Sequence, residues 1–302
     1  MGLEFLAAAA LILLSVSHWF PLGIWPLELL SAFAHFTVLL CLLVFIGALF
    51  LKLRLLGVAA AVSLIMSAAL VFPHLAPFSG SEEPRFTIGQ FNAYHNNSTA
   101  NEAIQFISEI NPDIFTIQEL NSQWTPLLDS LFEQSHPYII AAPWDNCCYG
   151  IGIYSKFPIT SYEVLDLENT PVIIAHVLLD DFEVSVISLH TLPPAFPNET
   201  EERNIQLRAI SEIAETITNP VIVLGDFNLV PWDTEFKSFL KQGNLKAVRD
   251  GFQATFPTHI GVPLIPIDHI TYSENMVPTS CEAVTIPGSD HRGLVAGFAF
   301  KD

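Results

Sequence analysis

The pattern of hydrophobic and polar positions divides the chain into two dissimilar parts. Residues 1–76 contain three long apolar runs, and each run approaches the roughly 20 residues that cross the hydrocarbon core of a bilayer. The runs are residues 5–25, 29–51 and 55–72. This pattern predicts about three transmembrane helices connected by short turns.

The sequence leaves two questions about these runs open: whether each run spans the membrane, and on which side the connecting loops lie. A cleaved signal peptide is the alternative for the first run, although a basic start and a small-residue cleavage site are missing. Buried core helices are the alternative for the other two. Lys52 and Arg54 are the only bases before residue 81, so their loop is expected on the cytoplasmic side. The following domain would then be non-cytoplasmic, either periplasmic or extracellular.

The pattern changes after residues 77–84, which form a polar, proline-bounded linker. Strand periodicity is found at residues 85–92, 113–120, 150–159, 171–179, 182–190, 220–228, 265–273 and 291–300. Helix periodicity is found at residues 99–110, 199–217 and 234–243. Thr99 and Glu102 have the spacing of a capping box, and residues 260–267 favour a core strand. Hairpins mixed with helical crossovers predict an α/β sandwich with helices outside two mixed sheets.

The charge distribution restricts the class of partner. Of 302 residues, 51% are hydrophobic, and the four charges of residues 1–80 cancel. Residues 81–302 carry 29 acids and 10 bases, which is the whole net charge of −19. Proteins that bind nucleic acid through many phosphate contacts have a basic face, so tight nucleic-acid binding is not expected.

The four cysteines allow two interpretations. Cys41 lies in an apolar run, Cys147 and Cys148 are adjacent, and Cys281 is distant from both. In an oxidising compartment Cys281 could pair with one of the adjacent two, or all of these thiols could stay unpaired. The spacing does not match a metal site of the cysteine type.

Polar side chains recur where the expected strands of the second part end. Each has an ordinary interpretation as a turn or surface residue, but their chemical types fit one reaction. These residues are Asn92, Glu119, His190, Asp226, Asn228, Asp268, Asp290 and His291.

Hydrolysis of a phosphate ester requires a divalent cation, an oriented water and donors for the phosphate oxygens. The oxygen atoms of Asn92, Glu119 and Asp290 suit Mg²⁺. Asp226 is a candidate for activating the water, and Asn228, His190 and His291 are candidate donors. Asp268 could fix the tautomer of His291 and raise its pKa.

These residues occur in short motifs whose order resembles that of the endonuclease/exonuclease/phosphatase superfamily. The motifs are FN at Asn92, QE at Glu119, SLHT at His190, GDFN at Asp226 and Asn228, DHI at Asp268, and SDH at Asp290 and His291. The resemblance covers residues 85–302 and implies a four-layer α/β sandwich with a catalytic site along one edge of the paired sheets.

The resemblance also implies residue roles. Glu119 would be the principal ligand of Mg²⁺ or Mn²⁺, with Asn92 and Asp290 in or beside the metal shell. Asp226 would activate water, Asn228 would help to place the phosphate, and both histidines would contact it. No acid that would support His190 can be identified from the sequence.

The expected activity is metal-dependent hydrolysis of a phosphodiester by a membrane-anchored domain. A short nucleic acid is the first substrate class, and a phospholipid or sphingolipid headgroup is the alternative. A catalytically silent binding module is a second alternative, although every expected chemical position is filled.

Overall fold

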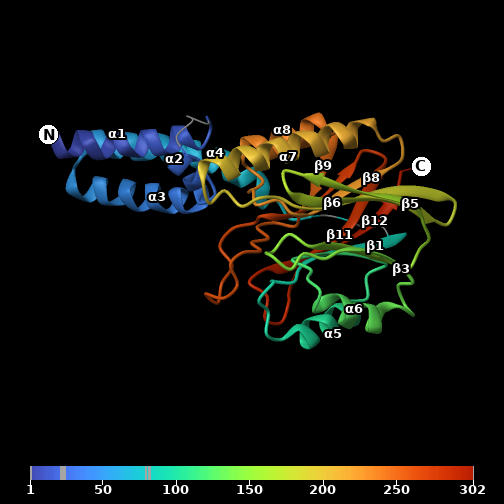
Figure 1. Cartoon of the computed structure of the whole chain (residues 1–302). Helices are drawn as coiled ribbons and strands as arrows, with labels where there is room; N and C mark the ends of the chain where they lie inside the picture. Colours follow the sequence, from blue (N-terminus) through green and yellow to red (C-terminus); the bar gives the residue numbers. More distant parts are fainter. Residues whose placement is uncertain (1, 21–24, 79, 81–82, 302) are drawn as a thin grey trace. The chain divides into compact units, whose positions relative to one another are not determined.

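The computed structural model describes residues 2–20, 25–78, 80 and 83–301, and it divides into two compact units (Figure 1). The first unit consists of residues 1–76 together with residues 230–237. The second consists of residues 77–229 and 238–302 and contains both β-sheets.

The first unit is built from apolar helices. Its elements are α1 (Gly2–Ser17), α2 (Trp25–Ser31), α3 (Ala34–Leu51), α4 (Arg54–Val71) and the 3₁₀ helix η1 (Phe72–Leu75). Two helical segments, Ala34–Leu51 and Arg54–Leu75, are long and apolar enough to cross a membrane, judged by length and composition alone. The first expected span, 5–25, differs from the structure because α1 ends at Ser17, while residues 21–24 lie outside the described part of the chain.

Local hydrogen bonds explain how these helices begin and end. Lys52 adopts the left-handed conformation (φ 58°) and ends α3, and the N–H of Leu53 then bonds to the Ala48 carbonyl at 2.9 Å. Glu4 Oε1 accepts the N–H of Leu55 at 3.0 Å, so a carboxylate satisfies a free donor at the start of α4. In the same unit the indole of Trp232 is fully buried and donates to the Ser31 carbonyl at 2.7 Å.

The second unit contains two six-stranded mixed sheets. The first sheet has the order β11 (Met276–Thr285), β12 (Arg292–Phe300), β1 (Phe86–Asn92), β2 (Ile114–Gln118), β4 (Ile151–Ser155), β3 (Tyr138–Ala142). The second has the order β5 (Ile159–Leu167), β6 (Thr170–Leu179), β7 (Phe182–His190), β8 (Val221–Asp226), β10 (Asp268–Ser273), β9 (Leu245–Val248). Each sheet has one parallel pair, β1–β2 and β7–β8, and its other pairs are antiparallel.

The helices cover the outer faces of the two sheets. One apolar core, which includes Ile88, Val186 and Leu224, fills the space between the sheets. A second core joins the outer face of the first sheet to α5 (Ala100–Ile110) and α6 (Trp124–Phe132). Helix α7 (Pro197–Thr216) lies on the side of the second sheet (Figure 1), and α8 spans Thr234–Gln242. The predicted sandwich of two packed mixed sheets with flanking helices is confirmed.

Three local predictions were wrong. Thr99 precedes α5 but makes no capping bond, because its N–H and its hydroxyl both donate to Asn97 Oδ1. The expected strand 150–159 is two strands in different sheets, since the chain turns where Phe157 bonds to Ser155 Oγ. The expected core strand 260–267 is mainly a turn, with only an isolated bridge at Ile265.

Candidate active site

The two parallel strand pairs deliver functional side chains to one edge of the sandwich. In the second sheet His190 and Asp226 are register partners at the ends of β7 and β8. Asp268 begins the antiparallel strand β10 and is also paired with Asp226. In the first sheet, Asn92 ends β1, and its Nδ2 lies 3.3 Å from Asp226 Oδ2. This contact joins the edges of the two sheets at one site.

Asp226 lies at the centre of this site and is almost completely buried. Its Oδ2 atom faces Nε2 of His190 at 3.5 Å and Nε2 of His291 at 3.6 Å. Its Oδ1 atom accepts the backbone N–H of Asn228 at 2.9 Å. The two imidazole separations are longer than a good hydrogen bond, so both rings retain capacity for another partner.

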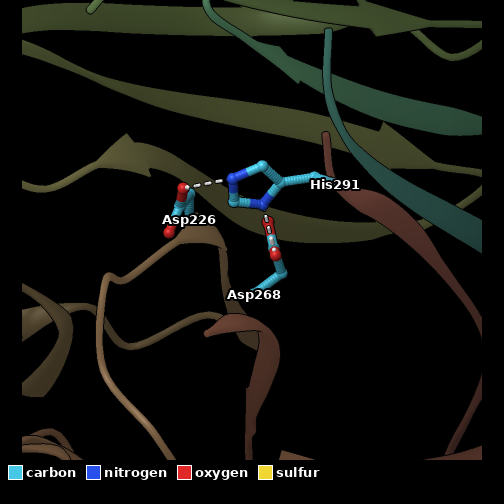
Figure 2. A group of neighbouring side chains, drawn as sticks. All are labelled: Asp226, Asp268 and His291. Atoms are coloured by element: carbon cyan, nitrogen blue, oxygen red, sulfur yellow. Dashed lines mark hydrogen bonds and ion pairs between the residues drawn. The ribbon is translucent and has the colours of Figure 1, made fainter. Parts of the chain in front are cut away.

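His291 is held between two carboxylates (Figure 2). Its Nδ1 atom is 2.8 Å from Asp268 Oδ2, and its Nε2 atom faces Asp226. Gln90 donates to the other oxygen of Asp268 at 2.8 Å, so this fully buried carboxylate is held on both sides. The structure thus brings Asp268 into contact with His291, and the supporting role expected for Asp268 stays a prediction.

Burial and mutual charge separate the pKa values of the two central groups. Burial, followed by the charge of Asp268, raises the pKa of Asp226 to about 6. Burial opposes the charged form of His291, but Asp268 and Asp226 outweigh it and raise the pKa of His291 to about 10. These shifts favour the protonated form of His291 and bring the pKa of Asp226 closer to neutral pH.

His190 is supported by the backbone instead of by an acid. Its Nδ1 atom lies 3.0 Å from the carbonyl oxygen of Cys148, and a carbonyl can only accept. Nδ1 therefore carries the proton, and Nε2 donates only when the ring is protonated. The ring of Tyr149 lies 5.4 Å from that of His190, centroid to centroid.

Glu119 and Asn92 form an oxygen-rich part of the site. Asn92 Nδ2 donates to Glu119 Oε1 at 3.1 Å, and the N–H of His95 donates to Glu119 Oε2 at 2.6 Å. Glu119 has a positive φ of 64°, which turns the chain directly after β2. Burial raises the pKa of Asp290, and the nearby charge of Glu119 raises it further. The Oδ1 atom of Asp290 is buried and has no hydrogen-bond partner among the described residues.

The structure contains a compact group that could hold a metal ion. Asp226, Asp268 and His291 each offer one ligand atom, and these atoms lie within 4.8 Å of one another. The bond between Nδ1 of His291 and Asp268 requires a proton, whereas a metal on that nitrogen would exclude it. Asn92, Glu119 and Asp290, in contrast, present the hard oxygen donors that suit Mg²⁺.

Donors fix the backbone of the turn after β8, in which Asn228 has a positive φ of 49°. Four consecutive carbonyls, at residues 226–229, each accept a hydrogen bond. The donors are Thr191 N to Asp226 (3.0 Å), Thr191 Oγ1 to Phe227 (2.6 Å), Arg203 Nη1 to Asn228 (3.3 Å) and His269 Nε2 to Leu229 (2.7 Å). Gly225 precedes the turn with φ 144°, and a Cβ there would collide with the Leu189 carbonyl. The turn is therefore rigidly positioned.

A comparison with protein-family models identifies the domain. Residues 89–291, more than half of the chain, match the model of the endonuclease/exonuclease/phosphatase family. The chain belongs to this family. Its members are phosphoesterase hydrolases. No curated protein matches the chain.

Solved structures share the fold of this family member at low sequence identity. One is an endonuclease/exonuclease/phosphatase family protein from Bacteroides thetaiotaomicron (17% identity, TM-score 0.61, covering 74% of this chain and 97% of the other). Another is TDP2 from D. rerio complexed with a single-strand DNA product (19%, 0.59, 71% and 98%). A third is sphingomyelinase C from Streptomyces griseocarneus (16%, 0.56, 70% and 98%). At these identities the likeness establishes the fold alone.

Several residues that shape this family site carried no visible sequence signal. Gln90 and His269 both resemble ordinary residues of strands. His269 is fully buried, and its Nδ1 atom accepts from Arg249 Nη2 at 2.6 Å. That contact requires Nε2 to carry the proton that His269 donates to Leu229. A histidine directly after Asp268 in a buried strand is the one sequence feature that could have indicated this role.

Proposed function

We propose that the chain is a membrane-anchored, divalent-metal-dependent phosphodiesterase of the nuclease type. The observation that carries this proposal is the position of Asp226, whose carboxylate faces the imidazoles of His190 and His291 at 3.5 and 3.6 Å. A base flanked by two donors suits the attack of water on a phosphate. Membership of a phosphoesterase family supports the same reaction class.

The side chains divide the work of hydrolysis. Asp226 takes the proton of the attacking water, and its raised pKa of about 6 makes it a stronger base than an ordinary carboxylate. Nε2 of His291 donates to a phosphate oxygen, and Asp268 keeps that ring charged. His190 donates to a second oxygen in its protonated form, held by the Cys148 carbonyl. Asn228 helps to place the phosphate from the turn after β8.

The oxygen donors at the edge of the first sheet fit a divalent cation. Glu119 and Asn92 are bonded to each other, and Asp290 has a buried oxygen that the described residues leave without a partner. These three residues would hold Mg²⁺ or Mn²⁺, and the bound cation would stabilise charge on a phosphoryl oxygen.

A lipid phosphodiester is the second candidate substrate, and one loop favours it. The loop of residues 257–264 begins next to the site. Its Thr258 N–H donates to the Asp290 carbonyl at 2.8 Å. The ring of Phe256 lies 4.8 Å from that of His291. At the tip of the loop Ile260 and Val262 are 54% and 68% exposed. An exposed apolar tip beside the site suits contact with a lipid surface.

The anchoring and its direction are parts of the same proposal. Two apolar helices of sufficient length support a membrane anchor, and Lys52 and Arg54 at the junction of these helices support a cytoplasmic turn. The catalytic domain would then act outside the cytoplasm. The acidic excess of this domain favours short or transiently bound nucleic acid over long duplexes.

The test uses the full chain purified in detergent. We expect hydrolysis of a chromogenic model phosphodiester with Mg²⁺ or Mn²⁺ and loss of activity after chelation. Activity that survives complete chelation would exclude the metal-dependent mechanism. A parallel panel of single-stranded oligonucleotides and phosphatidylcholine–sphingomyelin vesicles orders the two substrate classes. Cleavage of vesicle lipid without cleavage of oligonucleotides would make the lipid headgroup, and not nucleic acid, the preferred substrate class.

A further inference from the structure

A pair of adjacent thiols lies in the loop that connects β3 to β4. The Sγ atoms of Cys147 and Cys148 are 2.7 Å apart. Cys147 is exposed and Cys148 is partly buried, whereas Cys41 and Cys281 are both buried. The structure therefore places Cys147 and Cys148 beside each other, and of these two Cys147 is open to small molecules in solution.

This loop is tied firmly to the chain that follows β2. Leu120 N–H donates to the Gly150 carbonyl at 2.9 Å, and Trp144 N–H donates to the Leu120 carbonyl at 3.0 Å. Asp145 accepts the N–H of Ser122 at 2.8 Å. A Cβ at Gly150 would collide with the Leu120 carbonyl oxygen, which shows how closely the two segments approach. The thiols are thus presented on a fixed loop at the site.

The loop also supports a residue of the proposed machinery. The carbonyl of Cys148 accepts the Nδ1 proton of His190 at 3.0 Å, and the next ring along the chain, Tyr149, lies against that imidazole. Any change in the peptide geometry at Cys148 therefore acts directly on His190.

We propose that Cys147 and Cys148 form a redox modification site, at which a small disulfide compound oxidises the pair to a disulfide between neighbours. The chemistry of the thiols is independent of the proposed function. The effect of oxidation on hydrolysis rests on the proposed role of His190.

The reaction is two successive thiol–disulfide exchanges with a disulfide RSSR. The exposed Cys147 thiolate attacks one sulfur of RSSR, which forms a mixed disulfide and releases RS⁻. The Cys148 thiolate then attacks the Cys147 sulfur and releases the second RS⁻. The released thiolates take up the two protons that the cysteines lose, so the pair is oxidised by two electrons and RSSR is reduced to two RSH. Burial raises the pKa of Cys148, which assigns the first attack to Cys147.

The product is expected to be reversible. Neighbouring Cα atoms are about 3.8 Å apart, below the range of about 4.4–6.8 Å that disulfides usually span. Strained disulfides are the readily reduced ones, and they act as labile or regulatory bonds. Closing this small ring also moves the Cys148 carbonyl away from the geometry in which it holds His190. Oxidation should therefore lower the rate of hydrolysis, and reduction should restore it.

Peptide mapping by mass spectrometry tests the modification without any activity measurement. The full chain in detergent is equilibrated with oxidised glutathione, and free thiols are then blocked with iodoacetamide. The peptide that carries both cysteines should be unlabelled and lighter by two hydrogens, and dithiothreitol should make both thiols available to the label. Cys281→Ser, a matched control, should behave like wild type. Three results would overturn the proposal. They are labelling of both cysteines after the oxidant, a stable glutathione adduct on Cys147, and a disulfide between two chains.

Activity then tests the effect on His190. Wild type should lose activity several-fold on oxidation and regain it with dithiothreitol. Cys147→Ser should hydrolyse substrate at the wild-type rate before and after oxidant. A reduced wild-type chain with no activity would contradict the proposed function and leave the mass result standing. An active chain that forms the disulfide but keeps its full rate would overturn the effect on His190.

Discussion

Nδ1 of His291 lies 2.8 Å from Oδ2 of Asp268, and both residues are buried. The charges of Asp268 and of Asp226, which lies on the other side of the ring, raise the pKa of His291 to about 10 in spite of its burial. In the proposed reaction His291 acts as the cationic donor and Asp226 as the base at neutral pH.

Replacement of Asp268 should remove the charge of His291. In Asp268→Asn the pKa of His291 should fall well below 10, because burial still opposes the charged form and one of its two carboxylates is gone. Nε2 would no longer donate at neutral pH, and hydrolysis should fall about 100-fold. An NMR titration of His291 and a rate measurement check this together. Asp113→Asn is the control and should change neither value, because Asp113 precedes β2 at the end of that strand remote from Glu119.

The contact between Arg249 and His269 should position the catalytic turn without touching substrate. In His269→Asn the Leu229 carbonyl loses its donor, so the turn that carries Asp226 and Asn228 loses one of its backbone anchors. We expect kcat to fall about tenfold with little change in KM, since a small displacement at the reacting centre weakens transition-state contacts most. Arg249→Lys, which retains a donor to Nδ1 of His269, should lose less of the rate than His269→Asn does. His176→Asn, in the same sheet, controls for loss of a histidine.

The tautomer of His269 gives an independent readout of this role. In wild type Nδ1 should be the unprotonated nitrogen, because Arg249 can only donate to it. Nitrogen chemical shifts measure this directly. A wild-type ring protonated on Nδ1, or a His269→Asn enzyme with unchanged kcat, would contradict the assignment.

Some of this arrangement could be predicted from the sequence and some could not. Asp226 and His190 follow apolar strands and carry reactive side chains, so their meeting at a sheet edge follows from strand periodicity and the order of the motifs. The Cys148 carbonyl could not be predicted as the partner of His190, because a backbone acceptor has no residue identity. It depends on how the loop of residues 143–150 folds back, which alternation of polar and apolar residues does not encode.

Buried strands of the fold could be predicted from the sequence, whereas exposed strands and loops could not. Strands such as Val221–Asp226 are buried on both faces and give continuous apolar runs. The exposed strand Ile159–Leu167 lies at a sheet edge and has a weak pattern, so the sequence predicts a single strand, 150–159, that ends where this one begins. Residues 260–267 differ from the predicted core strand because apolar composition alone cannot distinguish a core strand from an apolar loop with exposed residues such as Ile260 and Val262.

The helical unit should depend on Trp232. Its fully buried indole donates to the Ser31 carbonyl, so Trp232→Phe should cost about 1 kcal/mol and Trp232→Ala about 3–5 kcal/mol in the stability of that unit. Thermal unfolding of the full chain in detergent measures both losses. Leu131→Ala, an exposed apolar position on α6, should have little effect.

Because the indole of Trp232 donates to the Ser31 carbonyl, we also expect the N-terminal helices to remain in the mature protein. N-terminal sequencing would contradict this if the chain began after residue 31.

Stability should fall in acid through His136. This buried imidazole bonds to the Pro112 carbonyl at 2.8 Å, and burial lowers its pKa below the ordinary 6.5. The unfolded chain therefore binds a proton first as the pH falls, and the stabilising contribution of neutral His136 is complete above about pH 6.5 and lost below it. Denaturant unfolding between pH 7.5 and about 5 should show a shallower decline in His136→Gln than in wild type. Equal slopes would exclude a role for His136.

In the proposed function Asp226 is the base of a metal-dependent phosphodiesterase. The most direct measurement compares hydrolysis of a model phosphodiester by wild type, Asp226→Asn and the exposed control Asp166→Asn, all at saturating Mg²⁺. Asp226→Asn should keep the fold and lose about 10³-fold or more in kcat, since general-base catalysis contributes about 10²–10⁴-fold. Asp166→Asn should match wild type. Equal rates for Asp226→Asn and wild type would contradict the account.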